Sequence, residues 1–419
     1  MNRTLYPASI YGQVDIPASK GQTIRALLIA LFAKGVSKIH NPLISSDTKA
    51  CIDYCIKLGA KVDYIDDTII VDSTNLNSNA SFEIDCRDSG TTLYFTTALS
   101  CLLNNEITLN CDEILQKRPA GPLLVSLQEL GATIRPSNTD SPPYTVKGPL
   151  IGGHTKIRCM TSQYLSALLL TCPLAQSDTT IDVSMLQEKQ YVVMTERWLV
   201  RQGISFFRND QMSRYTIYGN QKYKSFETTI NGNFASAAYF LCAAAITGST
   251  ITLNGLDSNS TQADLEVLTI LSRMGCSISK NANSITITGP ARLTASDFDV
   301  NTVPDSLPAL AIAASFATGP VKLYNVPQAR YKKSDRISTI VQNLNAIGGQ
   351  AKELPDGLIV FPVDSFKSGT VKSFKDPSIV MAMAIASLKC NGPLTICDSE
   401  CVDETFPAFF DKLKSISVS

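Results

Sequence analysis

Clusters of positive charge stand where helices are expected to begin, and they are the residues with the clearest chemical use. Lys20 and Arg25 open an apolar segment, and Lys117 and Arg118 stand directly before a Pro-Ala-Gly turn. A third run, 330–336, holds four cations in seven residues. Helix N-termini attract anions, and nearby Lys or Arg strengthens that attraction. These segments indicate anion binding, with a solvated charged face as the alternative for each one taken singly.

Three further segments place hydroxyl, amide or carboxylate groups at expected helix starts. They are Asp88-Ser89-Gly90-Thr91-Thr92, Thr161-Ser162-Gln163 and Pro304-Asp305-Ser306. Such residues are ordinary helix N-caps, so none of these segments is specific alone. Because the charged and polar segments take matched positions in a repeat, the sequence predicts anion recognition between two domains.

The repeat is marked by glycines that end amphipathic segments. Gly59, Gly131, Gly203, Gly275 and Gly348 are 72, 72, 72 and 73 residues apart. A glycine just past a helix end is the usual left-handed cap. The alternating apolar and polar residues that follow it indicate a half-buried strand. The chain is therefore predicted to contain six units of about 70 residues.

Each unit is expected to hold one wholly apolar helix, such as 164–173, and one amphipathic helix, such as 48–58. An apolar helix must be buried, whereas an amphipathic helix covers a sheet. The predicted fold class is therefore α/β, with three units in each of two domains and with helices inside and sheets outside. The first domain is predicted at 13–228. The second is predicted at 1–12 plus 229–419, completed by an N-terminal strand at 4–13. A solenoid of six stacked units is the alternative.

Composition narrows the class of protein. The 419 residues carry 37 basic and 37 acidic side chains, which argues against a general nucleic-acid partner. The apolar segment 235–246 is too short to span a bilayer, and no export signal is visible at the N-terminus. The twelve cysteines lack CxxC spacing and are interpreted as reduced core residues. We expect a cytoplasmic protein without a metal, a cofactor or a membrane partner.

The charged and polar segments together resemble the 5-enolpyruvylshikimate-3-phosphate synthases and the wider enolpyruvyl transferase family. The opening residues Pro17-Ala18-Ser19-Lys20 and Arg25-Ala26-Leu27 are similar to the family's PGSKS…RAL. The resemblance spans nearly the whole chain and implies a pair of inside-out α/β barrels that close over ligands at a hinge. Its further motifs are Ser46-Asp47-Thr48, Gly90-Thr91-Thr92, Arg118-Pro119, Ser162-Gln163-Tyr164, Ser236-Ala237-Ala238, Pro304-Asp305, Ser334-Asp335-Arg336 and Thr405-Phe406-Pro407.

The resemblance implies transfer of the enolpyruvyl group of phosphoenolpyruvate to the 5-hydroxyl of shikimate-3-phosphate, by a monomer. Asp305, Lys20 and Lys333 take the catalytic positions, with Asp305 as the base for the hydroxyl. The residues implied to bind shikimate-3-phosphate are Lys20, Arg25, Thr161, Ser162, Gln163, Tyr191, Asp305, Gln328 and Lys332. Those implied to bind phosphoenolpyruvate are Lys20, Gly90, Arg118, Gln163 and Arg336.

The sequence also departs from the family pattern. An expected Glu is Lys333, an expected Arg is Ser378, and an expected Lys is Glu404; the other departures are Gly21, Tyr94, Glu188 and Asn233. Losing two or three charge-assisted hydrogen bonds to phosphoenolpyruvate costs roughly 3–9 kcal/mol. This leads to three hypotheses: a transferase with a weakened site, a paralogue acting on another small phosphorylated acid, or a silent binding homologue.

Overall fold

The computed structural model describes residues 1–76, 81–136 and 140–418. The chain divides into two compact units, with Met1–Ala18 and Asn231–Ser419 in unit 1 and Ser19–Ile230 in unit 2. The divisions lie six and two residues beyond the predicted boundaries. Strand β3 (Gly12–Asp15) pairs in parallel with β16 (Thr250–Asn254), and this pairing places residues 12–15 in unit 1. Two compact units form in place of one continuous stack.

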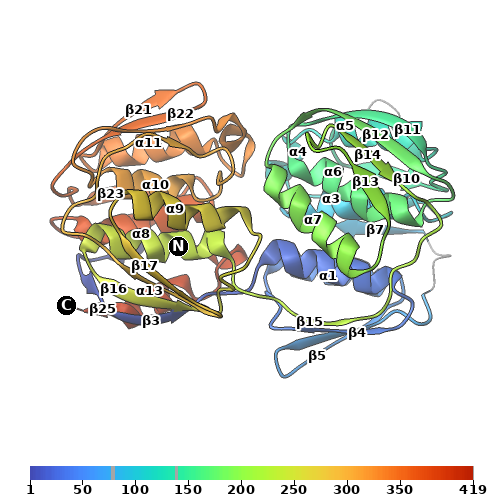
Figure 1. Cartoon of the computed structure of the whole chain (residues 1–419), viewed down its shortest axis with the longest axis horizontal. Helices are drawn as coiled ribbons and strands as arrows, with labels where there is room; N and C mark the ends of the chain where they lie inside the picture. The colour runs from blue at the N-terminus through green and yellow to red at the C-terminus, as the bar shows by residue number, and fades with distance from the viewer. Residues whose placement is uncertain (77–80, 137–139, 419) are drawn as a thin grey trace. The chain divides into compact units, whose positions relative to one another are not determined.

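Unit 2 contains buried helices packed against four-stranded sheets (Figure 1): α3 contacts α6, β8 and β10, and α6 contacts β11. The helices are α1 (Lys20–Phe32), α2 (Ser46–Lys57), α3 (Gly90–Ser100), α4 (Glu113–Gln116), α5 (Gly121–Glu129), α6 (Ser162–Thr171), the 3-10 helix η1 (Cys172–Leu174) and α7 (Lys189–Arg201). In sheet order the strands are β15 (Glu227–Thr229), β4 (Val36–His40), β6 (Thr68–Asp72) and β5 (Lys61–Ile65); β7 (Phe82–Asp85), β8 (Ile107–Asn110), β10 (Tyr144–Lys147) and β9 (Thr133–Arg135); and β11 (Gly153–Cys159), β12 (Thr179–Leu186), β14 (Arg214–Ile217) and β13 (Phe206–Arg208).

Unit 1 repeats this layering, with α8, α10 and α12 packed together inside it. Its helices are α8 (Phe234–Thr247), η2 (Ala263–Leu265), α9 (Glu266–Arg273), α10 (Leu307–Ala314), η3 (Pro327–Tyr331), α11 (Arg336–Ala346), α12 (Pro377–Ala386), η4 (Ser387–Lys389), η5 (Ser399–Glu404) and α13 (Phe409–Ile416). Its sheets are β17 (Ser277–Asn281), β18 (Ser284–Thr288), β16 and β3; β19 (Phe298–Asp299), β20 (Val321–Tyr324), β22 (Gly357–Phe361) and β21 (Gln350–Leu354); β1 (Arg3–Leu5), β24 (Leu394–Cys397) and β23 (Gly369–Lys372); and the pair β2 (Ser9–Ile10) with β25 (Ser417–Val418).

The predicted helix ends are confirmed. Gly59, Gly131, Gly203, Gly275 and Gly348 all have positive φ angles, between 70° and 107°. Each follows a helix by two residues, where a left-handed residue can satisfy the final carbonyl groups. The amphipathic helix predicted at 48–58 begins two residues earlier, at Ser46, where the Ser45 backbone N–H donates to Thr48 Oγ1 at 2.8 Å, one of the two bonds of a capping box.

The single N-terminal strand predicted at 4–13 is wrong. This segment forms β1, β2 and the start of β3, which lie in three different sheets. Pro7 separates the first two strands because it cannot donate to a sheet ladder, and Gly12 turns the chain with φ 111°. Strand β1 nevertheless adds antiparallel to β24, so the N-terminus does complete the last sheet.

Candidate active site: two sets of predicted residues

The predicted site residues divide between the two units. Unit 2 holds eight of them: Lys20, Arg25, Gly90, Arg118, Thr161, Ser162, Gln163 and Tyr191. Unit 1 holds the other five: Asp305, Gln328, Lys332, Lys333 and Arg336. Most of them lie at or just before the first turn of a helix, as the sequence analysis expects.

Lys20 is the first residue of α1, and its charge is balanced within unit 2. Its Nζ lies 2.7 Å from Oδ2 of Asp47, which is buried in the first turn of α2. The Lys20 side chain keeps about a fifth of its surface exposed. This pair holds the ammonium at the N-terminal end of α1 while leaving part of it accessible to a ligand.

Arg25 is a buried cation with neutral partners. Its guanidinium donates to the Thr195 hydroxyl at 2.8 Å, to the carbonyls of Gly21 and Tyr191 at 2.9 and 3.2 Å, and weakly to Ser166 Oγ at 3.5 Å. The residue is 3% exposed, and no carboxylate among the described residues forms an ion pair with it. Burial lowers the pKa of Arg25 to about 9, so the group remains charged at neutral pH. A buried charge without a counter-ion is costly, and an anionic ligand would supply one.

Gly90, Arg118 and Gln163 are brought together, as predicted for one ligand. A methyl group placed on Gly90 would lie 3.3 Å from Nη1 of Arg118 and 3.4 Å from Oε1 of Gln163. The amide nitrogen of Gln163 donates to Thr91 Oγ1 at 2.8 Å. The Nε atom of Arg118 is buried and has no hydrogen-bond partner among the described residues. The cluster therefore offers a cationic donor that an anion at the start of α3 can satisfy.

Thr161 and Ser162 lie together at the N-terminus of α6, but they meet a carboxylate of this chain. Oε2 of Glu188 accepts from Thr161 Oγ1 at 3.3 Å, from the Ser162 backbone N–H at 3.3 Å and from Ser162 Oγ at 3.1 Å. Glu188 is 3% exposed. Tyr191, one turn further along, presents its carbonyl to Arg25. In the sequence, Glu188 stands out only as a departure from the family pattern, and these contacts are not predicted.

Three of the predicted residues of unit 1, Asp305, Lys332 and Arg336, form a charged network that includes the buried carboxylate of Asp376. Asp376 is fully buried and accepts two hydrogen bonds from Arg336, at 2.9 Å from Nε and 3.2 Å from Nη2. The remaining Arg336 nitrogen, Nη1, donates to Oδ1 of Asp305 at 2.6 Å, and Nζ of Lys332 lies 3.3 Å from the same oxygen. Asp305, the predicted base, is thus held by two cations.

The pKa values in this network follow from burial and charge. Burial alone would raise the pKa of Asp376, but the Arg336 charge and the hydrogen bonds to Asp376 lower it below its ordinary value. Burial alone would lower the pKa of Arg336, and the carboxylates of Asp376 and Asp305 raise it above its ordinary value. Both groups therefore remain charged at neutral pH, which is the usual state of a well-bonded buried pair.

Lys333 and Gln328 complete the unit 1 set. Lys333 forms an ion pair with Glu404, at the end of η5, so that two residues departing from the family pattern contact each other. Gln328 is buried and donates to the carbonyl of Asn301 at 2.8 Å. Its Oε1 has no hydrogen-bond partner among the described residues, which leaves an acceptor for a ligand hydroxyl.

Sequence reasoning missed Asp376 as the counter-ion of Arg336. The sequence Asp376-Pro377 does indicate a helix N-cap, because an Asp before Pro is typical of that position. In the structure Asp376 accepts from the Ser378 backbone N–H as an N-cap does. That the same carboxylate reaches Arg336, 40 positions away, follows only from the fold. Ser378 occupies the first turn of α12 and is 6% exposed.

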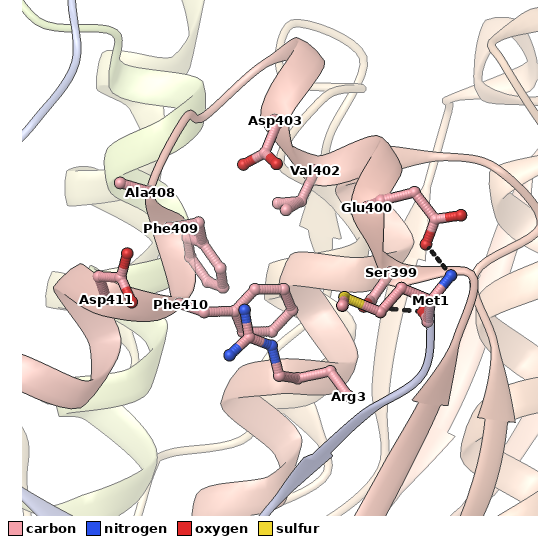
Figure 2. A pocket seen from close by; sticks show the side chains of 10 residues that line it. All are labelled: Met1, Arg3, Ser399, Glu400, Val402, Asp403, Ala408, Phe409, Phe410 and Asp411. Atoms are coloured by element: carbon pink, nitrogen blue, oxygen red, sulfur yellow. Dashed lines mark hydrogen bonds and ion pairs between the residues drawn. The ribbon is translucent and has the colours of Figure 1, made fainter.

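A pocket of about 290 Å³ in unit 1 is lined by none of the predicted site residues. Figure 2 shows Arg3 over the ring of Phe410 in it, with the N-terminal amine of Met1 beside Glu400. No group of three potential His, Cys, Asp or Glu ligands gathers in the parts of the chain that the structure describes. Within the same ranges, every helix is too short or too polar to cross a membrane.

Nearly the whole chain matches a known protein family. The sequence profile of EPSP synthase (3-phosphoshikimate 1-carboxyvinyltransferase) matches residues 6–413. The chain belongs to this EPSP synthase family. It is 38% identical to the 3-phosphoshikimate 1-carboxyvinyltransferase of Ruminiclostridium cellulolyticum over 97% of this chain and 96% of that one. It is 32% identical to the protein of that name from Methanococcus maripaludis, over 97% and 96%.

Solved structures support the same fold. The EPSP synthase of Acinetobacter baumannii superposes with a TM-score of 0.86, covering all of this chain and 98% of that one, at 23% sequence identity. At this identity the likeness concerns the fold alone, which is the two-domain α/β architecture of these synthases. The family resemblance predicted from the motifs is confirmed.

The Asp376–Arg336 pair yields a stability prediction. Replacing Asp376 with Asn should destabilise the protein by about 3–5 kcal/mol at pH 7, because it leaves the buried guanidinium without its bidentate partner. The folded-state pKa of Asp376 is depressed, so its stabilisation is present above the unfolded pKa of about 3.9 and is lost as the pH falls through the folded value. Urea unfolding at pH 7 and pH 3 measures both effects.

Asp15 provides the control for this measurement. It is exposed and pairs at 3.5 Å with Lys412, so Asp15→Asn should change the unfolding free energy by less than about 0.5 kcal/mol. Equal stability of Asp376→Asn and the unsubstituted protein at pH 7 would contradict the assignment.

Proposed function

We propose that this protein transfers the enolpyruvyl group of phosphoenolpyruvate to the 5-hydroxyl of shikimate-3-phosphate, the reaction of the shikimate pathway for aromatic amino acids. The observation that carries the proposal is a pair of arginines, Arg25 and Arg118, that lack a carboxylate partner among the described residues at positions implied to bind these anions. We also propose that the fold consists of six units in two inside-out barrels, and that the protein acts in the cytoplasm as a monomer without a cofactor.

The direct test is turnover by the pure protein. Phosphate release is measured with both substrates, and with each substrate alone as the control. We expect phosphate only when both are present, together with an equal amount of the enolpyruvyl product. No release above the single-substrate background would reject the proposal.

The proposed roles are those that the family resemblance implies, and the contacts within each unit support them. In unit 2, Lys20, Arg25, Thr161, Ser162, Gln163 and Tyr191 serve shikimate-3-phosphate, and Lys20, Gly90, Arg118 and Gln163 serve phosphoenolpyruvate. In unit 1, Asp305, Gln328 and Lys332 serve shikimate-3-phosphate, and Arg336 serves phosphoenolpyruvate. Cations that hold the anionic groups also stabilise charge that develops as the bonds change.

In the addition step, the 5-hydroxyl oxygen bonds to C2 of phosphoenolpyruvate as Asp305 takes the hydroxyl proton. The π electrons of the C2–C3 bond take a proton at C3, which becomes a methyl group. In the elimination step, that methyl loses a proton, the double bond re-forms and phosphate leaves with the C2–O electron pair. The hydroxyl proton finally leaves with phosphate, so the atoms balance. These proton transfers are general acid–base catalysis.

We assign the proton transfers at C3 to Lys333 and Glu404 acting as a pair. Asp376 is unsuited because it is fully buried and bound by Arg336, Ser334 and Ser378. The Glu404 side chain is 29% exposed and that of Lys333 10% exposed. In the addition step the Lys333 ammonium gives the proton that C3 takes. In the elimination step the Glu404 carboxylate accepts one methyl proton, which returns to the Lys333 amine across the ion pair.

The pair can be tested by exchanging its charges. Lys333→Glu alone sets two carboxylates together and Glu404→Lys sets two ammonium groups together, so each should lower kcat by about 10²–10⁴-fold. The double variant restores opposite charges and should recover to within about tenfold of the unsubstituted rate. Steady-state phosphate release measures all four proteins. A double variant no better than the single variants would show that the residues do not act together.

Arg25 generates a second test, in which stability and binding should separate. Arg25→Met removes a buried charge while keeping much of its volume, so the ligand-free protein should be as stable as before or more stable. Its affinity for shikimate-3-phosphate should fall by about 10–100-fold, because one charge-assisted contact is lost. Thermal unfolding and calorimetric titration give the two values.

Arg25→Lys serves as the matched control, because it keeps the positive charge. It should retain part of the affinity that Arg25→Met loses. A destabilised Arg25→Met variant with unchanged affinity would indicate a structural role for Arg25.

A further inference from the structure

Glu188 lies where two helices begin at the same edge of a sheet. Strands β11 and β12 pair in parallel, with Cys159 opposite Leu186 at their carboxyl ends. After these ends the chain enters α6 and α7, and Glu188 is the N-cap residue of α7. Figure 1 shows the two helices in unit 2, where they contact each other. The Glu188 side chain therefore lies within reach of the first turn of α6.

The Glu188 carboxylate makes the contacts that a bound anion would make at a helix N-terminus. It accepts one backbone N–H and two hydroxyl groups at the N-terminus of α6, all within 3.3 Å. These are the kinds of donor that hold phosphate or carboxylate at a helix start. They belong to Thr161 and Ser162, which the proposed function gives to the acceptor substrate. These donors cannot fully satisfy the Glu188 carboxylate and the anionic group of the substrate at the same time.

The backbone at Glu188 indicates that this placement is constrained. Its φ and ψ angles are 55° and 44°, in the left-handed region that non-glycine residues rarely adopt. Such a conformation persists only when surrounding contacts compensate for its strain. Here the hydrogen bonds from Thr161 and Ser162 are among those contacts. Any ligand that takes over these donors removes part of what holds Glu188 in place.

We propose that Glu188 is a specificity-determining residue that occupies the anion donors of α6 and must be displaced before a phosphorylated substrate can use them. The inference rests on the proposed function for the identity of that substrate. Its consequence is weaker binding of shikimate-3-phosphate than the donor set alone would give. Two negative groups near the same donors also repel each other, which adds to the effect.

The test compares affinities in the full chain. Glu188→Gln keeps the shape of the side chain without its charge, and Glu188→Ser removes the competing group. Both variants should bind inorganic phosphate and shikimate-3-phosphate about tenfold more tightly than the unsubstituted protein, since one charge-assisted interaction no longer competes. Calorimetric titration measures the dissociation constants, and thermal unfolding reports whether each variant folds.

Glu196 supplies the matched control on the same helix. It is also buried, but it accepts from Tyr215 at 2.8 Å and pairs with Arg208. Glu196→Gln should leave both affinities within twofold. Unchanged or weaker binding of both ligands in Glu188→Gln and Glu188→Ser would overturn the proposal.

Measurements of phosphate affinity and of turnover distinguish the inference about Glu188 from the proposed transferase function. Tighter phosphate binding by the Glu188 variants, with no turnover by the unsubstituted protein, would reject the transferase proposal and support competition by Glu188. Turnover by the unsubstituted protein, with unchanged affinities in both variants, would uphold the transferase and overturn the role of Glu188.

Discussion

The need to compensate buried charge governs both sets of site residues. A charge removed from water requires an opposite charge or dense hydrogen bonding. In unit 1, Arg336 meets this need within the chain through Asp376 and Asp305. In unit 2, Arg25 has only neutral partners among the described residues. The first arrangement stabilises the fold and positions Asp305, whereas the second leaves a favourable place for an anion.

The layered architecture explains why such charges gather where they do. Each four-stranded sheet of the described chain joins a parallel strand pair to an antiparallel hairpin, and apolar helices lie beneath the sheets. The carboxyl ends of parallel strands deliver the chain to helix N-termini at one edge, as β11 and β12 do for α6 and α7. Backbone donors and short polar side chains are therefore concentrated at that edge, and anions are favoured there.

The sequence predicts the local elements better than the contacts between them. The glycines that end helices are recognisable because a left-handed cap demands a particular residue, and Gly59 and Gly131 have the expected positive φ. The grouping of Gly90, Arg118 and Gln163 came from matching family motifs. By contrast, the hydrogen bonds of Asp376 with Arg336 and of Glu188 with Ser162 depend on how distant segments pack. No local spacing encodes those distances, so sequence reasoning missed both contacts.

This difference changes how departures from a family pattern should be weighed. Counting Lys333 and Glu404 as separate losses assumes that each acts alone, but they are 71 positions apart and form one ion pair. Effects of residues in direct contact are not additive, and a changed partner can compensate for a changed residue. Glu188 is the opposite case, because its carboxylate occupies donors that the family pattern reserves for a ligand. The physical cost of a departure therefore depends on what the new side chain contacts, and a mismatch with the motif does not measure it.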